Sequence, residues 1–201
     1  KDFEQTASYN VHEMLSKVQG IEFTRYGIDG ITFNARGLNS AFNNKVVQMV
    51  DGRNSMAALS ANLPIYSLNA GTYNKEDLER IEIVLGPQTA LYGPNANNAV
   101  LNFISKDPRK YSGTTVAVTA GNHYQFSARL RHATKINSKW AYKLTGEYST
   151  GTEFLFYDSL HAGGGIFGPA VNIPEHNVNF NYRHLHGEAH LYYNINPQTT
   201  I

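Results

Sequence analysis

Hydrophobic and polar positions alternate strictly in the second half of the chain, from Ser112 onward. Three segments of nine to eleven residues, 124–133, 140–148 and 185–195, each place apolar and aromatic residues on one face and charged or polar residues on the other. Strands of about this length cross the wall of an outer-membrane barrel, where such alternation is typical. A water-soluble antiparallel sheet with one face on a core gives the same alternation, so the pattern alone leaves both folds open.

The connections between these segments are unequal in length. Residues 135–139 read as a tight polar turn, whereas residues 151–177 form a long segment that contains three consecutive glycines, Gly163 to Gly165. Short turns at one end of a sheet and long loops at the other favour the barrel. We count four wall strands and the start of a fifth, which cannot close a barrel without exposing an unpaired edge to lipid. We therefore expect the chain to be part of a longer protein, with further strands after Ile201.

The first 108 residues have a mixed α/β pattern instead. Apolar residues recur at helical spacing in residues 9–18, and Gly20 lies where a helix would end. Short strands are predicted at residues 31–36, 45–50, 77–85 and 99–105. The first two of these strands each end at a glycine turn, Arg36-Gly37 and Asp51-Gly52.

Two Gly-Pro pairs, Gly86-Pro87 and Gly93-Pro94, interrupt this half just where its strands are most apolar. Proline fixes φ and removes a backbone donor, so a strand cannot continue through it. Glycine supplies the backbone freedom that the bend needs. We therefore predict that residues 88–92 fold back as a short segment and that residues 101–104 return to the sheet.

Composition narrows the function classes. The net charge of +1 gives no electrostatic case for binding nucleic acid. The absence of cysteine excludes disulfide scaffolds, zinc–thiolate sites and cysteine nucleophiles. No phosphate-binding loop, dinucleotide-binding glycine motif or serine-hydrolase elbow occurs, so we expect a protein that is not an enzyme and has no cofactor.

Six short motifs follow one another in the first half of the chain. They are Gly20-Ile21-Glu22-Phe23, the ITFNARGL of residues 31–38, the VVQMVDGR of residues 46–53, the LERIEIVLGP of residues 78–87, the ALYG of residues 90–93 and the ANNAVLNFISK of residues 96–106. In this order and at this spacing, residues 17–108 resemble the plug domain of TonB-dependent outer-membrane receptors. Each motif alone is weakly specific, and their combination carries the resemblance.

The resemblance implies a fold and a function. The fold is an α+β plug domain at residues 1–110, followed by a transmembrane antiparallel β-barrel whose N-terminal part is residues 111–201 and which has about 22 strands in full. The function is energy-coupled uptake, across the cell outer membrane, of a scarce solute such as siderophore-iron or a similar chelate. A plugged barrel that serves in assembly or signalling without import is the alternative, and a soluble binding module is a third.

The resemblance also implies partners. They are a TonB-type energy-coupling protein of the inner membrane, a small solute such as a metal chelate, and outer-membrane lipid. A surface lipoprotein or larger complex is a further candidate partner. The coupling segment is expected before Lys1.

Two features of the sequence differ among members of the family. The family usually has a basic residue before its first Gly-Pro, where this chain has Leu85. The Leu-Tyr-Gly-Pro-Asn of residues 91–95 is closer to the siderophore, cobalamin and small-chelate branches than to glycan importers.

Three sets of functional residues follow from the resemblance. Arg36 and Arg80 match basic plug positions that, in the family, pair with carboxylates of the barrel wall and so act as a latch. Glu79 and Glu82 flank Arg80 in this latch. Plain structural roles for both arginines are equally open, with Arg80 and Glu82 pairing on one strand face. The loops after Gly37 and Gly52 are expected to point outward and contact the solute. Their candidate contacts are Asn39, Phe42, Asn43, Asn44, Arg53, Asn54 and Tyr66. The structural turns are expected at Gly37, Gly52, Gly86, Pro87, Gly93 and Pro94.

Three histidines near the C-terminal end, His184, His186 and His190, raise the question of a metal site. His186 and His190 share a strand face with Glu188, but a strand rises about 3.3 Å per residue, which separates the two histidines by about 13 Å. One ion cannot bind both. We therefore expect no metal site and interpret these residues as polar groups facing a lumen.

Overall fold

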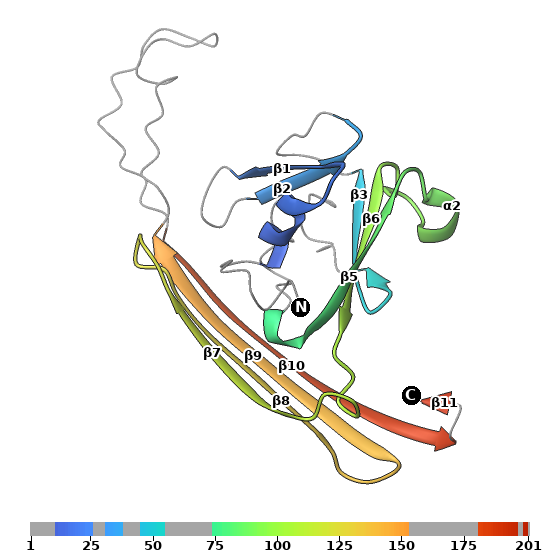
Figure 1. Ribbon diagram of the computed structural model, residues 1–201, viewed down its shortest axis with the longest axis vertical. Coiled ribbons are helices and arrows are strands. Elements are labelled where there is room, and N and C mark those ends of the chain that lie inside the picture. Colours follow the sequence, from blue (N-terminus) through green and yellow to red (C-terminus); the bar gives the residue numbers. More distant parts are fainter. Residues whose placement is uncertain are drawn as a thin grey trace, which may run out of the picture.

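The computed structural model describes residues 11–25, 31–37, 45–54, 74–152, 181–196 and 199–200. These residues form two parts (Figure 1). The N-terminal half, residues 11–105, contains two small sheets and short helices, and it lies against the concave face of a long curved sheet formed by the rest of the chain. No helix among the described residues is long and apolar enough to cross a membrane.

The first helix, η1 (Val11–Lys17), is a 3-10 helix, whereas the spacing predicts an α-helix over residues 9–18. Its buried residues are Val11, His12, Met14 and Leu15. They form two pairs three residues apart, which eclipse on a helix of three residues per turn and so present one narrow apolar face. Residues 9 and 10 lie outside the described part of the chain.

The strands of the N-terminal half form two sheets. β1 (Ile21–Arg25) pairs antiparallel with β2 (Ile31–Ala35). The second sheet has the order β4-β3-β6-β5, with β3 (Val46–Val50), β4 (Arg53–Asn54), β5 (Leu78–Leu85) and β6 (Ala99–Ser105). β3 and β6 run parallel, and the other neighbours run antiparallel. The four strands predicted in this half are confirmed within one residue, and β1 and the two-residue β4 are additional.

The main core lies between η1, the two-stranded sheet and one face of the four-stranded sheet. Leu15, Ile31, Leu101 and Phe103 are fully buried there. His12 is buried with them, stacked on Phe33 with ring centroids 6.1 Å apart and edge-on to Phe103 at 5.3 Å. Burial lowers the pKa of His12 to about 4, although its hydrogen bond with Gln48 acts in the opposite direction. The helix is therefore fixed to the sheets by apolar contacts and one neutral imidazole.

The two Gly-Pro pairs enclose α2 (Thr89–Tyr92), a single helical turn between β5 and β6. Gly86 and Gly93 adopt φ angles of 116° and 82°, which favour glycine. The amide of Gly86 donates to the carbonyl of Asn98 at 2.7 Å, which returns the chain to the strand it left. The structure thus contains the folded-back segment that the sequence predicts at residues 88–92.

The long sheet has the order β11-β10-β9-β8-β7, and every neighbouring pair is antiparallel. Its strands are β7 (Gly113–Ala120), β8 (Phe126–Lys135), β9 (Trp140–Thr152), β10 (Asn181–Asn196) and β11 (Thr199–Thr200). The expected four strands and start of a fifth are confirmed. β9 and β10, with 13 and 16 residues, are longer than the alternating segments indicate because pairing continues beyond the regular alternation.

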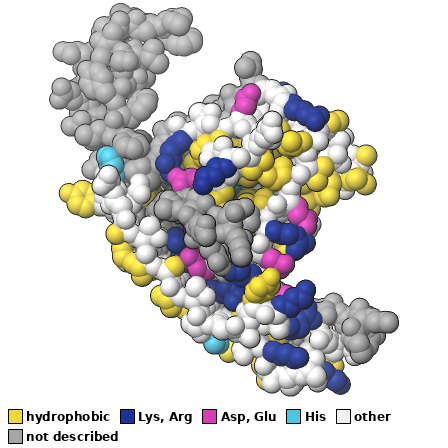
Figure 2. Space-filling model, in the orientation of Figure 1, with side chains coloured by type: hydrophobic (Ala, Val, Ile, Leu, Met, Phe, Trp, Pro, Cys, Tyr) yellow, Lys and Arg dark blue, Asp and Glu magenta, His cyan; other side chains and the backbone are white. Residues whose placement is uncertain are grey.

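The polarity of the long sheet is the reverse of that of a water-soluble sheet. Its concave face is polar, and Arg129, Arg131 and Lys143 are buried there against the N-terminal half. Its convex face exposes apolar side chains, including Leu185, which is 85% exposed. Figure 2 shows hydrophobic side chains along the convex edge and charged ones between the sheet and the N-terminal half. This arrangement excludes the soluble-sheet alternative and matches a lipid-facing wall.

A linker, residues 106–112, joins β6 to β7 and shows which end of the plug strands corresponds to which end of the long sheet. The start of β7 pairs with the end of β8, next to the tight turn at residues 136–139. We call this the short-turn end. The opposite end of the long sheet is where residues 153–180, which lie outside the described residues, connect β9 to β10; we call it the long-connection end. Because β6 runs toward the linker, α2 and the start of β6 lie toward the long-connection end (Figure 1).

Candidate functional site

Five charged side chains meet where the N-terminal half packs on the long sheet. Asp77 lies 2.7 Å from both the Arg131 Nε and the Lys143 Nζ, and Glu76 lies 2.9 Å from the Arg129 Nε. These side chains are nearly removed from solvent, with Lys143 1% exposed and Glu76, the most accessible, 14%. We call them the interface cluster. Two carboxylates come from the N-terminal half and three cations from the long sheet.

Local structure explains how the carboxylates reach the sheet. They belong to η3 (Lys75–Asp77), a single 3-10 turn that leads directly into β5. Asn74 caps this turn, because its Oδ1 accepts from the Glu76 amide at 3.0 Å. The Nδ2 of the same side chain donates to the Leu130 carbonyl at 2.9 Å and to the Gly146 carbonyl at 3.3 Å. Asn74 therefore caps the turn and attaches it to β8 and β9.

The cations of the cluster are held by further polar contacts. Arg129 donates to the Ser127 hydroxyl at 3.0 Å and to the Thr119 hydroxyl at 3.2 Å. Arg131 donates to the Tyr111 carbonyl at 2.9 Å, and its Nη2 has no hydrogen-bond partner among the described residues. Lys106 of the linker donates to the Glu76 carbonyl at 3.1 Å. The cluster thus connects η3, the linker and three strands of the sheet.

Buried ion pairs of this kind contribute little net stability, because the cost of removing the ions from water offsets their attraction. Breaking one partner is costly, because it leaves an uncompensated buried charge. The contact between the two parts is therefore selective without being strongly adhesive. Such an interface holds one arrangement and can be separated without exposing a large apolar surface.

The interface cluster has the opposite polarity to the latch that the resemblance implies. The interface cluster uses carboxylates of the N-terminal half and cations of the sheet, and sequence reasoning missed all five residues. Arg80 instead pairs with Glu82 at 2.8 Å and Glu79 at 3.3 Å on its own strand, and it is half exposed. The guanidinium of Arg36 lies beside Gly86. Pairing of either arginine with carboxylates of a more complete wall stays a prediction.

The predicted solute contacts divide into two groups. Asn39, Phe42, Asn43, Asn44 and Tyr66 lie outside the described residues. Arg53 and Asn54 form β4, which follows the two-residue turn Asp51-Gly52. Asp51 accepts from the Ser105 amide at 2.8 Å, so this turn lies beside the end of β6 that enters the linker.

The outward direction of the loop after Gly52 stays a prediction, because residues 55–73 lie outside the described residues. The turn Asp51-Gly52 itself lies at the short-turn end. Its direction follows from the parallel pairing of β3 with β6, which ends both strands on the linker side. Pattern and spacing do not reveal that β3 is parallel to a strand more than 50 residues later. The turn at Gly37, in contrast, is next to Asn98 at the start of β6, toward the long-connection end.

The described residues at the long-connection end include an exposed apolar pair that the sequence analysis did not select. Leu91 of α2 is 79% exposed and Tyr92 is 40% exposed. Both lie between the Gly-Pro pairs, on the turn that faces away from the core. The sequence does contain a signal for this pair. Leu91 and Tyr92 are large apolar residues between two Gly-Pro turns, outside the strand pattern, so neither has a core position to fill.

The histidines of β10 lie on the concave face. Glu188 is 3.2 Å from the His190 Nε2 and 3.6 Å from the His186 Nε2. Across the ranges that the structure describes, no group of three or more His, Asp or Glu side chains is arranged to hold a metal ion. These residues form a polar row along the strand.

Comparisons with known proteins bear on this arrangement. Residues 1–100 match the family model of the TonB-dependent receptor plug domain. The chain is 28% identical over 150 residues to the vitamin B12 transporter BtuB of Vibrio vulnificus (strain CMCP6), covering 74% of this chain and 23% of that protein. It is 38% identical over 69 residues to the ferrioxamine receptor of Yersinia enterocolitica, covering 34% of this chain and 10% of the receptor.

The fold is similar to that of a solved receptor. A mutant of the ferric enterobactin receptor PfeA from Pseudomonas aeruginosa superposes with a TM-score of 0.65 at 17% identity, over 99% of this chain and 30% of the receptor. The chain thus spans about a third or less of the proteins that it matches. Accordingly, the N-terminal half is the plug, and the long sheet is the beginning of the barrel wall. The boundary between residues 110 and 111 stays a prediction. The chain belongs to the TonB-dependent receptors of the outer membrane.

Proposed function

We propose that the protein of which this chain is part imports a scarce solute across the outer membrane with energy supplied from the inner membrane. The solute class is a siderophore-bound iron or a similar small chelate. The names of two relatives, a vitamin B12 transporter and a ferrioxamine receptor, support this range of solutes. The Leu-Tyr-Gly-Pro-Asn of residues 91–95 favours the same range over glycans.

The interface cluster is the observation that carries the proposal. A plug that must be displaced and then return needs a contact that specifies one position without strong adhesion. Carboxylates of η3 against cations of β8 and β9, with Asn74 beside them, provide such a contact. A permanently closed barrel would gain more from apolar packing at this position, since replacing buried ion pairs by apolar residues is often stabilising.

The solute would bind at the long-connection end, which corresponds to the outer side because outer-membrane barrels have their long loops there. Leu91 and Tyr92 of α2 offer an apolar and aromatic surface at this end, and Asn39, Phe42, Asn43, Asn44 and Tyr66 remain candidate contacts. Binding would favour one of two plug positions. A TonB-type protein of the inner membrane would then engage a segment on the N-terminal side of the plug, by strand addition, and favour the other position.

The test uses the full-length gene in its own host, with a deletion strain and a complemented strain. Uptake of three radiolabelled probes, a ferric hydroxamate, a ferric catecholate and cyanocobalamin, is measured with and without a protonophore. The proposal expects that deletion abolishes uptake of one probe, that complementation restores it and that the protonophore blocks it. If uptake of every probe survives deletion, the chain is not an importer of this class, and if uptake survives the protonophore, transport is not energy-coupled.

A matched pair of variants connects the result to the cluster. Asp77→Asn removes the carboxylate between two buried cations, whereas Glu79→Gln removes a carboxylate beside the exposed Arg80 on β5, the strand that directly follows η3. We expect Asp77→Asn to alter the uptake rate of the identified solute and Glu79→Gln to leave it unchanged. Equal rates for the two variants would separate transport from the interface cluster.

A further inference from the structure

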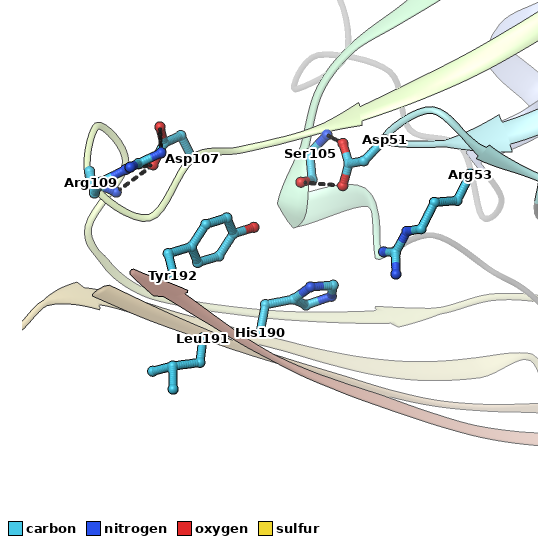
Figure 3. A pocket seen from close by; sticks show the side chains of 8 residues that line it. All are labelled: Asp51, Arg53, Ser105, Asp107, Arg109, His190, Leu191 and Tyr192. Carbon is cyan, nitrogen blue, oxygen red and sulfur yellow. Dashed lines mark hydrogen bonds and ion pairs between the residues drawn. The ribbon is translucent and has the colours of Figure 1, made fainter. Parts of the chain in front are cut away.

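A cavity of about 400 Å³ lies at the short-turn end, between the plug and β10 (Figure 3). It is far along the plug from α2, at the end of β6 that enters the linker. Polar side chains come from both parts of the molecule and from the linker between them. The plug provides Asp51, Arg53 and Ser105, the linker provides Asp107 and Arg109, and β10 provides His190 and Tyr192. Its volume is within the range of small-molecule sites, which is about 300–1,000 Å³.

The two carboxylates that line the cavity are already engaged. Asp51 accepts from the Ser105 amide at 2.8 Å and from the Ser105 hydroxyl at 2.7 Å. Asp107 receives both the Nε and the Nη2 of Arg109, each at 2.9 Å. Burial alone would raise the pKa of Asp107, but the hydrogen bonds from Arg109 outweigh it and hold that pKa below its usual value.

Arg109 is fixed in place and is not available as a free cation. Its Nη1 donates to the Asn194 Oδ1 at 2.5 Å, and its guanidinium lies over the Tyr192 ring at 5.7 Å from the centroid. Together with the pair to Asp107, these contacts engage all three nitrogens of the guanidinium. Arg109 therefore serves as one wall of the cavity and orients Tyr192.

Arg53 is different. Its guanidinium points toward the cavity beside His190 (Figure 3), and no described residue forms an ion pair or hydrogen bond with it. Among the described residues the formal charges of the lining balance, with Asp51 and Asp107 against Arg53 and Arg109, but Arg53 is the charged side chain of the lining that has no side-chain partner. Further hydrogen-bonding groups nearby are the Tyr192 phenol and the His190 imidazole, which also contacts Glu188 at 3.2 Å. A planar guanidinium is suited to bind a carboxylate through two parallel hydrogen bonds.

We propose that this cavity binds a small organic monocarboxylate on the periplasmic side of the receptor, with Arg53 as the anion-binding residue and Tyr192 and His190 as hydrogen-bonding neighbours. The Arg53 guanidinium offers a fork of donors for one carboxylate group. A phosphate dianion is disfavoured, because the second charge would have no cation and would lie near the Asp51 and Asp107 carboxylates. The site is distinct from the outer end where the proposed function places the solute, and its existence does not depend on transport.

The test measures binding to the full-length receptor in detergent micelles. The probe is 4-fluorobenzoate, followed by the ¹⁹F line width, with 4-fluorobenzamide as the neutral analogue and 4-fluorophenyl phosphate as the dianionic one. We expect the benzoate to bind, and to bind more tightly than either analogue. Loss of the charge in Arg53→Gln should weaken its binding about tenfold to a hundredfold, because a hydrogen bond to a charged group is lost.

Lys110→Gln is the matched control. Lys110 is an exposed cation of the same linker that does not line the cavity. We expect it to leave the affinity for the benzoate within about twofold and Arg53→Lys to restore part of the affinity, since an ammonium keeps the charge but not the fork. Equal affinity of Arg53→Gln and the unaltered receptor, or tighter binding of the amide or the phosphate, would overturn the proposal.

A second measurement identifies the source of the carboxylate. If Arg53→Gln slows import of the solute found in the uptake experiment while leaving its binding at the outer end unchanged, the carboxylate belongs to the departing solute. If import is unaffected and the benzoate still binds, the site takes a free periplasmic anion. Either result supports the site, whereas absence of benzoate binding refutes it even when import proceeds normally.

Discussion

Replacing Asp77 by asparagine tests the physical account of the interface cluster most directly. The side chain keeps its shape but loses the charge that lies between Arg131 and Lys143. Both distances are 2.7 Å, and Asp77, Arg131 and Lys143 are 3%, 4% and 1% exposed. The variant therefore leaves two cations buried side by side with no carboxylate between them.

The magnitude follows from two opposing contributions. At 2.7 Å, each pair has a gross Coulomb energy of about 6 kcal/mol with an effective dielectric constant of about 20. Removing the ions from water costs several kcal/mol for each ion, so the intact cluster contributes little net stability. The variant keeps the cost for both cations and loses the attraction. We therefore expect the plug to be destabilised by about 3–5 kcal/mol.

The assay is a urea titration of the full-length receptor with a fluorophore on the plug. These 201 residues contain no cysteine, so Lys17→Cys at the exposed end of η1 provides a labelling site, with any cysteine in the rest of the receptor replaced by serine. With a slope of about 2 kcal/mol per molar urea, a loss of about 4 kcal/mol lowers the midpoint by about 2 M. The barrel wall is followed separately by heat-modifiable gel mobility.

Two further variants make the result decisive. Glu79→Gln, at an exposed ion pair, should hardly move the midpoint. Changing Asp77 to leucine together with Arg131 and Lys143 to methionine removes all three charges and should be less destabilising than Asp77→Asn alone. The reasoning is refuted if Asp77→Asn moves the midpoint no further than Glu79→Gln, or if the triple variant is the least stable of all.

Three other predictions concern separate parts of the chain. Because burial lowers the pKa of His12 to about 4 from 6.5, the unfolded chain binds a proton between these pH values that the folded plug does not bind. The stability of the plug should therefore fall by about 3 kcal/mol as the pH decreases from 6.5 to 4, and urea titrations of His12→Leu should not show this decrease. Gly52 has a φ of 76° with open space at the Cβ position, so Gly52→Ala should cost about 1 kcal/mol in the same titration. Gly37→Ala, also in the plug, has no positive φ and would meet only ordinary contacts at 3.5 Å, so it should cost less. Leu185→Arg places a charge on the lipid-facing side of β10 and should destabilise the wall by about 2–4 kcal/mol, seen as a smaller heat-modifiable fraction, whereas His186→Arg on the concave side should not; equal fractions would contradict the assigned faces.

The periodicity of the sequence predicts the long sheet well, because strand faces depend only on a repeat of two. The apolar side chains of β8 and β10 lie on the convex face and their polar neighbours on the concave face, as the alternation indicates. Whether the polar face is buried depends on what fills the hollow of the sheet. Alternation carries no information about that, and the plug motifs supply it.

The interface cluster could not be predicted in the same way, because it depends on contacts across long separations in sequence. Asp77 and Arg131 are 54 positions apart. The sequence does contain a partial signal: Arg129 and Arg131 alternate on the polar face of one strand, and such a face needs carboxylates opposite if it is buried. The acidic pair of η3 satisfies that need, but only the three-dimensional placement of the turn shows it.

The linker sets how far the plug can travel. Ser105 and Gly113 are separated by eight residue steps, so this segment spans at most about 27 Å when fully extended. Asp107 and Arg109 hold part of it against Asn194 of the wall, which shortens the free portion further. A plug displaced from the lumen would consequently stay tethered close to the rim of the barrel. Its effective concentration for re-entry would remain in the millimolar range, so resealing would be an intramolecular event that needs no chaperone or second chain.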